Sequence, residues 1–159
     1  MLGRMSEHKA SIRWQSSGGE WAKGRYSREH TWAFDGGLTV PASSSPAAVP
    51  LPMSNPAHVD PEEAFVASLS SCHMLTYLYL CWREKIEVTS YEDDAVGLMT
   101  KNERGVPWIS TVYLNPRVVY RDKAPSHEDE VRLHHAAHEG CFISQSVKTD
   151  VQVELGEGG

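Results

Sequence analysis

The 159-residue chain has little of what marks secreted, membrane or nucleic-acid-binding proteins. Its three cysteines are an odd and sparse set, unlike the disulfide framework of a small secreted protein. The longest strongly apolar run, Met74 to Trp82, is nine residues, whereas about 20 are needed to cross a bilayer. The first residues, MLGRMSEHK, lack the apolar segment of a secretory signal. We therefore expect a cytoplasmic protein without a membrane segment.

The charge balance excludes another class of partner. Lys and Arg number 15 against 21 Asp and Glu, a net charge of -6, and a nucleic-acid-binding protein would need a concentrated basic face. Hydrophobic residues make up 40% and charged residues 23% of the chain, as in a soluble globular protein. Without repeats or breaks in composition, the sequence predicts a single domain over residues 1–159.

The order of elements predicts an α+β fold. Alternating segments typical of strands lie at 8–15, 26–34, 38–40, 86–99, 108–120 and 148–155. A long helix is predicted from Pro61 to about Glu84, with Asp60 as its cap and Glu63 at the capping-box position. This helix is apolar on nearly every side, so we expect it to be central and buried, with a partner subunit supplying part of its cover. A second helix is predicted from Ser126 to about Glu139.

One long segment has no regular pattern. The stretch from Pro41 to Pro61 contains six prolines together with several Ser and Ala residues, which disfavours helix and strand. A loop of this length inside a small domain is usually functional, so we expect a lid or a pocket wall here.

Two cysteines are candidates for chemistry. Cys72 lies within the long helix, in the segment SLSSCHM, where it is either a small buried hydrophobe or a reactive thiol in a locally polar setting. As a thiolate it would need a nearby cation, and we expect an arginine held by a carboxylate to supply it. Cys141 follows Gly140, where a helix N-terminus would lower the pKa of its thiol. Cys81, about half a turn round the helix from Cys72, is expected in the core.

A metal site is the alternative for the histidine-rich segment. His134, His138 and Cys141 share one helical face, and imidazole and thiolate both bind zinc. Gly140 interrupts the helix that would align them, and the sequence contains no CxxC pair. We therefore interpret the segment as a histidine-rich helix face, with no metal and no cofactor.

Taken together, DPEEAFVASLSSCHM and AHEGCFISQSVKTDV resemble the OsmC/Ohr family of osmotically inducible and organic hydroperoxide resistance proteins. The resemblance lies in the Pro-Glu helix start, the cysteine ten residues after Glu62, and the second cysteine, Cys141. Phe142 stands where many relatives have proline. The long helix, the strands and the total length also fit, so the resemblance covers nearly the whole chain.

The resemblance implies an OsmC-type fold: an intertwined homodimer in which sheets wrap two long helices. It also implies a thiol peroxidase that reduces organic hydroperoxides, with a dithiol of the lipoyl type as the reductant. Cys72 would be the peroxidatic nucleophile and Cys141 the resolving thiol, while Glu62 would orient an arginine that stabilises the Cys72 thiolate. The alternative is a protein of the same fold that binds an apolar ligand, with incidental cysteines.

The arginine is the least constrained member of this set. The chain has no arginine between Arg28 and Arg83, so the role falls to Arg28, with Arg25 and Arg13 as alternatives. Ten helical residues separate Glu62 from Cys72, a rise of about 15 Å. Because an arginine side chain spans roughly half of that rise, we expect the Glu62–Arg28 pair that serves one Cys72 to come largely from the other subunit.

Overall fold

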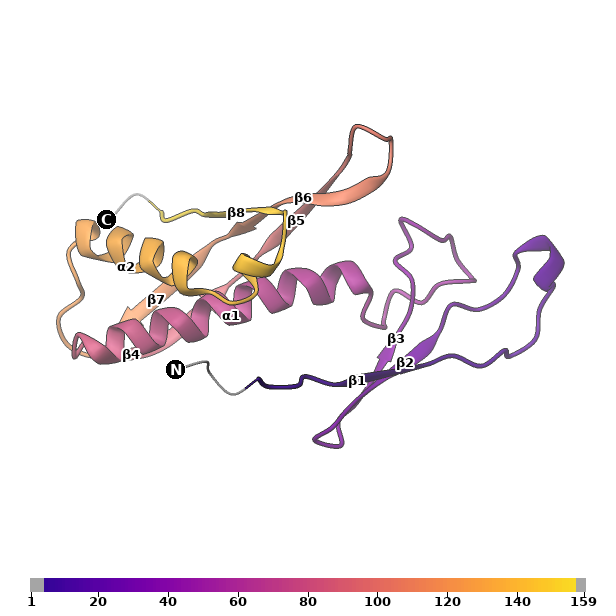
Figure 1. The fold of residues 1–159 in the computed structure, drawn as a ribbon, viewed down its shortest axis with the longest axis horizontal. Helices are drawn as coiled ribbons and strands as arrows, with labels where there is room; N and C mark the ends of the chain where they lie inside the picture. Colours follow the sequence, from indigo (N-terminus) through magenta and orange to yellow (C-terminus); the bar gives the residue numbers. More distant parts are fainter. Residues whose placement is uncertain (1–4, 157–159) are drawn as a thin grey trace. The chain divides into compact units, whose positions relative to one another are not determined.

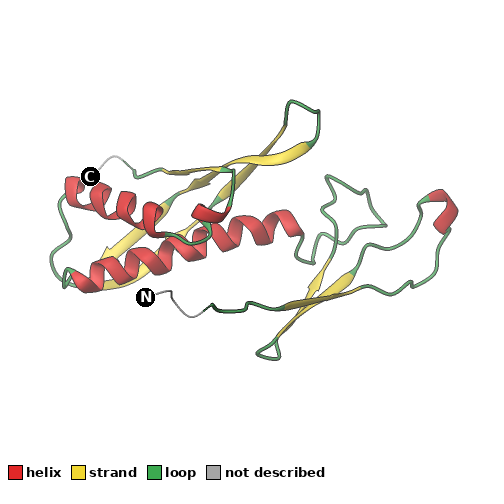
Figure 2. Ribbon diagram, in the orientation of Figure 1, coloured by secondary structure: helices red, strands yellow, loops and turns green. Residues whose placement is uncertain are grey.

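The computed structural model describes residues 5–156 as two compact units, one ending at Ala64 and the other beginning at Phe65 (Figures 1 and 2). The first unit contains three strands and a short 3-10 helix: β1 (Ala10–Arg13), η1 (Trp21–Lys23), β2 (His30–Phe34) and β3 (Thr39–Ala42). The long helix α1 (Pro61–Arg83) begins in the last four residues of the first unit. The second unit holds most of α1 and the remaining elements: β4 (Val88–Asp93), β5 (Val96–Lys101), β6 (Pro107–Leu114), β7 (Pro116–Tyr120), α2 (His127–Gly140), η2 (Ser144–Ser146) and β8 (Asp150–Val153).

The first unit is a three-stranded antiparallel sheet in the order β1-β2-β3. A tight turn joins β2 and β3: Gly37 has a φ of 92°, in the left-handed region that favours glycine, and its N–H donates to the Phe34 carbonyl. Pro41 and Ala42 of the proline-rich segment continue β3, contrary to expectation, and residues 43–60 form turns, bends and irregular backbone, as expected. The end of this segment returns to the sheet, because the Val59 N–H donates to the Pro41 carbonyl over 3.2 Å.

In the second unit, two predicted strands prove to be four. Segment 86–99 divides into β4 and β5, and segment 108–120 divides into β6 and β7, so that β4 pairs with β7 while β5 pairs with β6. Both segments divide at the same place, where Asn115, between β6 and β7, bonds to the end of β4. The Asn115 N–H donates to the Asp93 carboxylate over 2.7 Å, and the Asn115 side-chain amide donates to the Asp94 carbonyl. The α+β class is confirmed, although β8 joins the edge of β6 in parallel.

The helix starts follow from the residues that precede them. At α1, Asp60 Oδ1 accepts from the Glu63 N–H over 2.8 Å, and Glu63 Oε2 accepts from the Asp60 N–H over 3.2 Å. This reciprocal pair is the predicted capping box. At α2, the Ser126 hydroxyl accepts from the Asp129 N–H. Both predicted starts are therefore confirmed.

The expectation that α1 is buried on most sides is wrong for the single chain. Its buried residues fall four apart, on one stripe: Leu69, His73, Tyr77 and Cys81. The opposite side exposes large apolar residues, with Leu75, Tyr79 and Trp82 at 60%, 53% and 72%. Length and composition alone would let α1 cross a membrane, but core helices of soluble proteins pass the same test. In this structure α1 buries one stripe of residues in the apolar core of the second unit.

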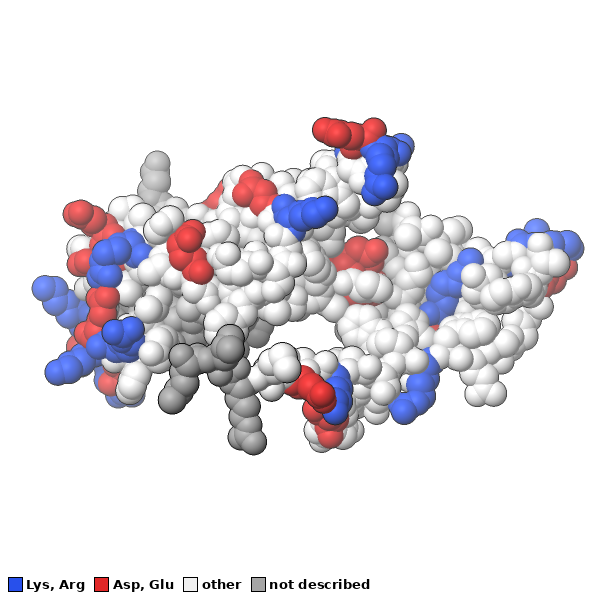
Figure 3. Space-filling model, in the orientation of Figure 1, with Lys and Arg blue, Asp and Glu red and all other residues white. Residues whose placement is uncertain are grey.

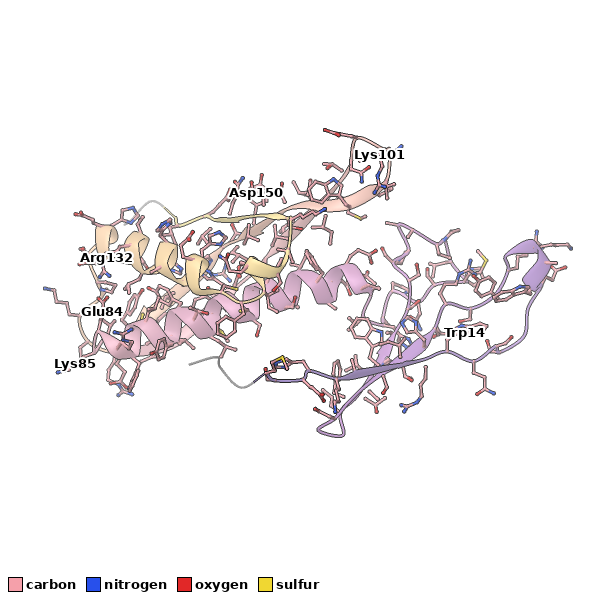
Figure 4. All side chains as sticks on the ribbon, in the orientation of Figure 1. Trp14, Glu84, Lys85, Lys101, Arg132 and Asp150 are labelled. Atoms are coloured by element: carbon pink, nitrogen blue, oxygen red, sulfur yellow. The ribbon has the colours of Figure 1, made fainter. Side chains whose placement is uncertain are left out.

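The second helix lies along α1 in the second unit (Figure 1). Leu133 and Ala137 of α2 pack with Tyr77 and Cys81 of α1 in one apolar cluster. Where α1 ends and α2 begins, Arg132 forms a bidentate ion pair with Glu84 at 2.9 and 2.8 Å (Figure 4). Charged side chains gather at that end on the face shown in Figure 3. The two helices are thus held together by apolar packing along their length and by an ion pair at one end.

Two histidines form a buried pair between these helices. His73 Nε2 and His134 Nδ1 are 3.0 Å apart, and the two rings are parallel to within 2°. The Tyr77 ring stacks on His134 with centroids 3.9 Å apart. Burial lowers the pKa of His73 to about 4 and that of His134 to about 3. Both imidazoles are therefore neutral at pH 7.

The outer nitrogens of this pair, Nδ1 of His73 and Nε2 of His134, are buried without a hydrogen-bond partner among residues 5–156. A buried polar atom left without a partner costs about 1–3 kcal/mol. The pair is thus a polar feature that the core accommodates at a loss of stability.

Removing the α1 cap should destabilise the fold. Asp60→Ala deletes the acceptor for the Glu63 N–H and should lower the free energy of unfolding by about 1 kcal/mol, as measured by urea denaturation. Asp60→Asn retains an oxygen acceptor and should change the free energy of unfolding by only a few tenths of a kcal/mol. Equal losses in the two variants would show that the cap is not the cause.

The histidine pair should make the fold acid-sensitive. Both histidine pKa values are depressed below the ordinary value of about 6.5, so the unfolded chain binds more protons between about pH 6.5 and 4. Stability should be full above this window and should fall as the pH is lowered through it. Asp93 and His138 also act on His73, Asp93 raising and His138 lowering its pKa. Their net effect is smaller than that of burial.

The measurement is urea unfolding at pH 7 and pH 5. The chain should lose more stability between these two values than the variant His73→Leu/His134→Leu, which has neither group to protonate. Equal losses in the two proteins would mean that other groups carry the acid sensitivity.

Candidate active site

The two candidate cysteines meet where the end of α2 approaches the middle of α1. Cys72 is half-buried on α1, Cys141 is fully buried as the cap residue that follows α2, and both are free thiols. Gly140 permits this approach, because a Cβ at that position would lie 3.2 Å from the Thr76 methyl carbon, one turn beyond Cys72. A small residue immediately before Cys141 therefore lets the two chain segments come together at the level of the thiols.

The two thiols act on each other's proton affinity. Burial raises the pKa of Cys72, and its hydrogen bond with Cys141 raises it further. For Cys141, burial also raises the pKa, but hydrogen bonds from Cys72 and Ser144 outweigh burial, so the net pKa lies below the ordinary value. The two sulfurs are therefore close enough for each to shift the pKa of the other.

The turn after Cys141 supplies peptide N–H groups to both sulfurs. The Ser144 N–H donates to Cys141 Sγ over 3.4 Å, and the Gln145 N–H donates to the Cys141 carbonyl over 3.1 Å. The N–H groups of Ile143 and Phe142 favour the charged form of Cys72 and lower its pKa, although less than burial raises it. The expected help from a helix N-terminus thus takes the form of a tight turn that leads into η2.

Such a dithiol can form and break a disulfide. The half-buried Cys72 can be reached by a substrate, whereas the fully buried Cys141 can react only with a partner inside the protein. No Lys or Arg contributes to the pKa of Cys72 in the described chain. A reactive Cys72 thiolate therefore needs a positive charge that does not act on it in the single chain.

Glu62 and Cys72 are not brought together. Glu62 lies half-buried in the first turn of α1. Because α1 runs without interruption to Arg83, the ten-residue spacing keeps a rise of about 15 Å between the two residues. The proposed role of Glu62 stays a prediction.

Arg28 is held in place inside the first unit. Its Nη1 donates to the carbonyls of Gly24 and Tyr26, and its guanidinium carbon lies 3.5 Å from the centre of the Tyr26 ring. Among residues 5–156, Arg28 forms no ion pair with Glu62, whereas the alternative Arg25 pairs with Glu20 at 3.0 Å. Since only Nη1 is used in these bonds, Arg28 keeps Nε and Nη2 as donors, and its assignment stays a prediction.

Two further expectations concern a metal and a pocket wall. In the described part of the chain, the histidine-rich segment forms no cluster of three or more side chains that could hold a metal ion. His134 instead bonds to His73, a pairing that the sequence analysis missed because two separate helices supply its members. Pro41 and His58, from the ends of the proline-rich segment, line a cavity of about 810 Å³ in the first unit.

Comparison with known proteins gives one family. The profile of the family described as OsmC-like protein matches residues 54–156. An OsmC-like protein of unknown function from Vibrio cholerae is 46% identical, with a TM-score of 0.92 over 95% of this chain and 99% of that chain. The comparison with curated proteins gives no match.

More distant structures share the fold. The organic hydroperoxide resistance protein OhrB of Bacillus subtilis is 23% identical, covers 93% of this chain and 98% of its own, and has a TM-score of 0.61. An organic hydroperoxide resistance protein from Elizabethkingia anophelis is 18% identical, covers 97% and 96%, and has a TM-score of 0.69. The family profile and the similarity to the Vibrio protein together show that this chain belongs to the OsmC-like family.

Proposed function

We propose that the protein is a thiol peroxidase that reduces organic hydroperoxides to alcohols. The observation that carries this proposal is the closeness of half-buried Cys72 to buried Cys141, two free thiols that shift each other's pKa. Distant relatives named as organic hydroperoxide resistance proteins share the fold and support it. A reachable thiol beside a protected one is the arrangement that a two-cysteine cycle needs.

The cycle balances in three steps. The Cys72 sulfur gives up its proton and attacks the outer oxygen of the hydroperoxide, the O–O bond breaks, and the alkoxide takes up a proton to leave as the alcohol. Cys72 is then a sulfenic acid. The Cys141 sulfur attacks the Cys72 sulfur, the sulfenic oxygen leaves as water, and a disulfide forms. A dithiol of the lipoyl type returns both residues to thiols while it is oxidised to its own disulfide.

Activation of Cys72 is proposed to require a second copy of the chain. The exposed apolar side of α1 includes Leu75 and Tyr79, three and seven residues after Cys72 and therefore on its side of the helix. A homodimer that buries this side would remove apolar surface from water. It would also bring Arg28 and Glu62 of the partner to Cys72, where the guanidinium would offset the burial that raises the thiol pKa.

The surroundings of the thiols favour an apolar substrate. Phe142, directly after Cys141, is 83% exposed. Apolar surface near the reacting sulfur binds the organic part of a hydroperoxide better than it binds hydrogen peroxide. The proposed setting of this activity is the cytoplasm, as part of the defence against oxidative stress.

The cysteine roles can be tested by intact mass. One equivalent of cumene hydroperoxide should remove two hydrogens from the reduced protein, and peptide mapping should place the new bond between Cys72 and Cys141. Cys72→Ser should abolish peroxide reduction. Cys141→Ser should leave a mass increase of one oxygen on Cys72, and Cys81→Ser serves as the matched control with unchanged turnover.

An unchanged mass in the native protein would refute the peroxidase function. The alternative function, binding of an apolar ligand, would then remain. Activity that persists in Cys72→Ser would assign the chemistry to another residue.

The origin of the arginine can be tested by complementation. Cys72→Ser and Arg28→Ala should each be inactive as pure proteins. If the arginine acts across the dimer, mixing and exchanging their subunits should restore about a quarter of native activity per chain, because half the dimers then contain one complete site.

The matched control mixes Cys72→Ser with Cys141→Ser, which tests whether exchange alone restores the dithiol cycle. No recovery with Arg28→Ala, despite exchange shown by mass spectrometry, would contradict an arginine supplied by the partner. The same experiment with Arg25→Ala and Arg13→Ala tests the two alternatives.

A further inference from the structure

The histidine pair lies next to both cysteines along the chain. His73 directly follows Cys72 on α1, and His134 precedes Cys141 by seven residues on α2. Seven residues are about two helical turns, so His134 and Cys141 lie on nearly the same side of α2. Each cysteine is therefore separated from one of the two histidines by only a short, regular stretch of backbone.

The contacts of His134 fix both the rotation and the axial position of α2 against α1. His134 Nδ1 is 3.0 Å from His73 Nε2, and its ring also stacks on Tyr77 at 3.9 Å. His73 and Tyr77 are four residues apart, so His134 rests against two successive turns of α1. Apolar neighbours such as Leu133 and Ala137 pack without direction, whereas a ring-to-ring hydrogen bond has a required distance and angle.

Stability does not account for the pair. His73 and His134 are 0% and 2% exposed, and each has an outer ring nitrogen without a partner among residues 5–156. Two apolar side chains of similar volume would fill the same space without leaving these atoms unpaired. Burial alone therefore gives no reason for a polar pair, rather than an apolar one, at this point in the core.

We propose that His73 and His134 are positioning residues that hold Cys141 at closing distance from Cys72. The inference rests on the proposed dithiol function and adds to it: the hydrogen bond sets the effective concentration of one thiol at the other. The two imidazoles do not contact substrate in this proposal. They act through the rotation of α2, which determines where its end and the Cys141 turn lie.

The test measures the equilibrium constant for the reaction of the protein dithiol with oxidised glutathione. Cys72 and Cys141 react with one oxidised glutathione to give the protein disulfide and two reduced glutathiones, and the equilibrium constant is the effective concentration of the thiol pair. His73→Leu/His134→Leu keeps the core filled but removes the hydrogen bond. Its effective concentration should fall about tenfold or more, although its stability to urea at pH 7 is unimpaired.

A conservative variant should restore the native value. In His73→Gln/His134→Asn the two side-chain amides place a donor and an acceptor near the positions of Nε2 and Nδ1. The effective concentration should stay within about threefold of native. Leu133→Val, which trims a buried apolar side chain of α2 and leaves the histidines intact, is the control for lost stability and should behave as the native protein does.

A native effective concentration in the leucine variant would overturn the proposal, as would an equal loss in the leucine and amide variants. If the leucine variant does not fold, His134→Phe retains the stacking on Tyr77 and is judged by the same criterion. The outcome is separable from that of the proposed function. A disulfide that forms with glutathione but not with hydroperoxide refutes the peroxidase alone, and a peroxidase whose effective concentration is indifferent to the histidines refutes the positioning role alone.

Discussion

The packing of α2 against α1 is the constraint on which the chemistry of this chain depends. Cys72 and Cys141 are 69 positions apart in sequence, and neither has a reactive partner nearby along the chain. The small Gly140, where a Cβ would crowd Thr76, and the bond between His73 and His134 let their segments come together. Since a disulfide forms only when the two sulfurs approach closely, the register of two helices decides whether this protein has a dithiol at all.

Burial and charge oppose each other at Cys72. Burial protects a sulfenic acid from further oxidation, but it also raises the pKa of the thiol that must first lose its proton. Peptide N–H groups of the turn after Cys141 offset part of this effect for both sulfurs. The remainder has to come from a cation, which is why the proposed mechanism depends on a guanidinium and on a second copy of the chain.

The exposed side of α1 also supports the proposed second copy of the chain. A helix with Leu75, Tyr79 and Trp82 more than half exposed is incomplete as a core element, although its opposite stripe is fully packed. In the proposed dimer, one event both covers this apolar surface and completes the charge around Cys72. Folding, assembly and activation would then share one interface.

The sequence by itself determined the parts of the molecule that depend on neighbours along the chain. Asp60 with Glu63 and Ser126 with Asp129 set the two helix starts, because caps act over three residues. The two segments around Cys72 and Cys141 were likewise recognisable in the sequence, through their resemblance to the OsmC/Ohr family. Tertiary structure decided the rest. It divided two apparent strands at Asn115 through bonds to Asp93 and Asp94, and it paired His73 with His134. Alternation and helical period describe one segment at a time, whereas a hydrogen bond between segments 61 residues apart depends on how whole elements pack.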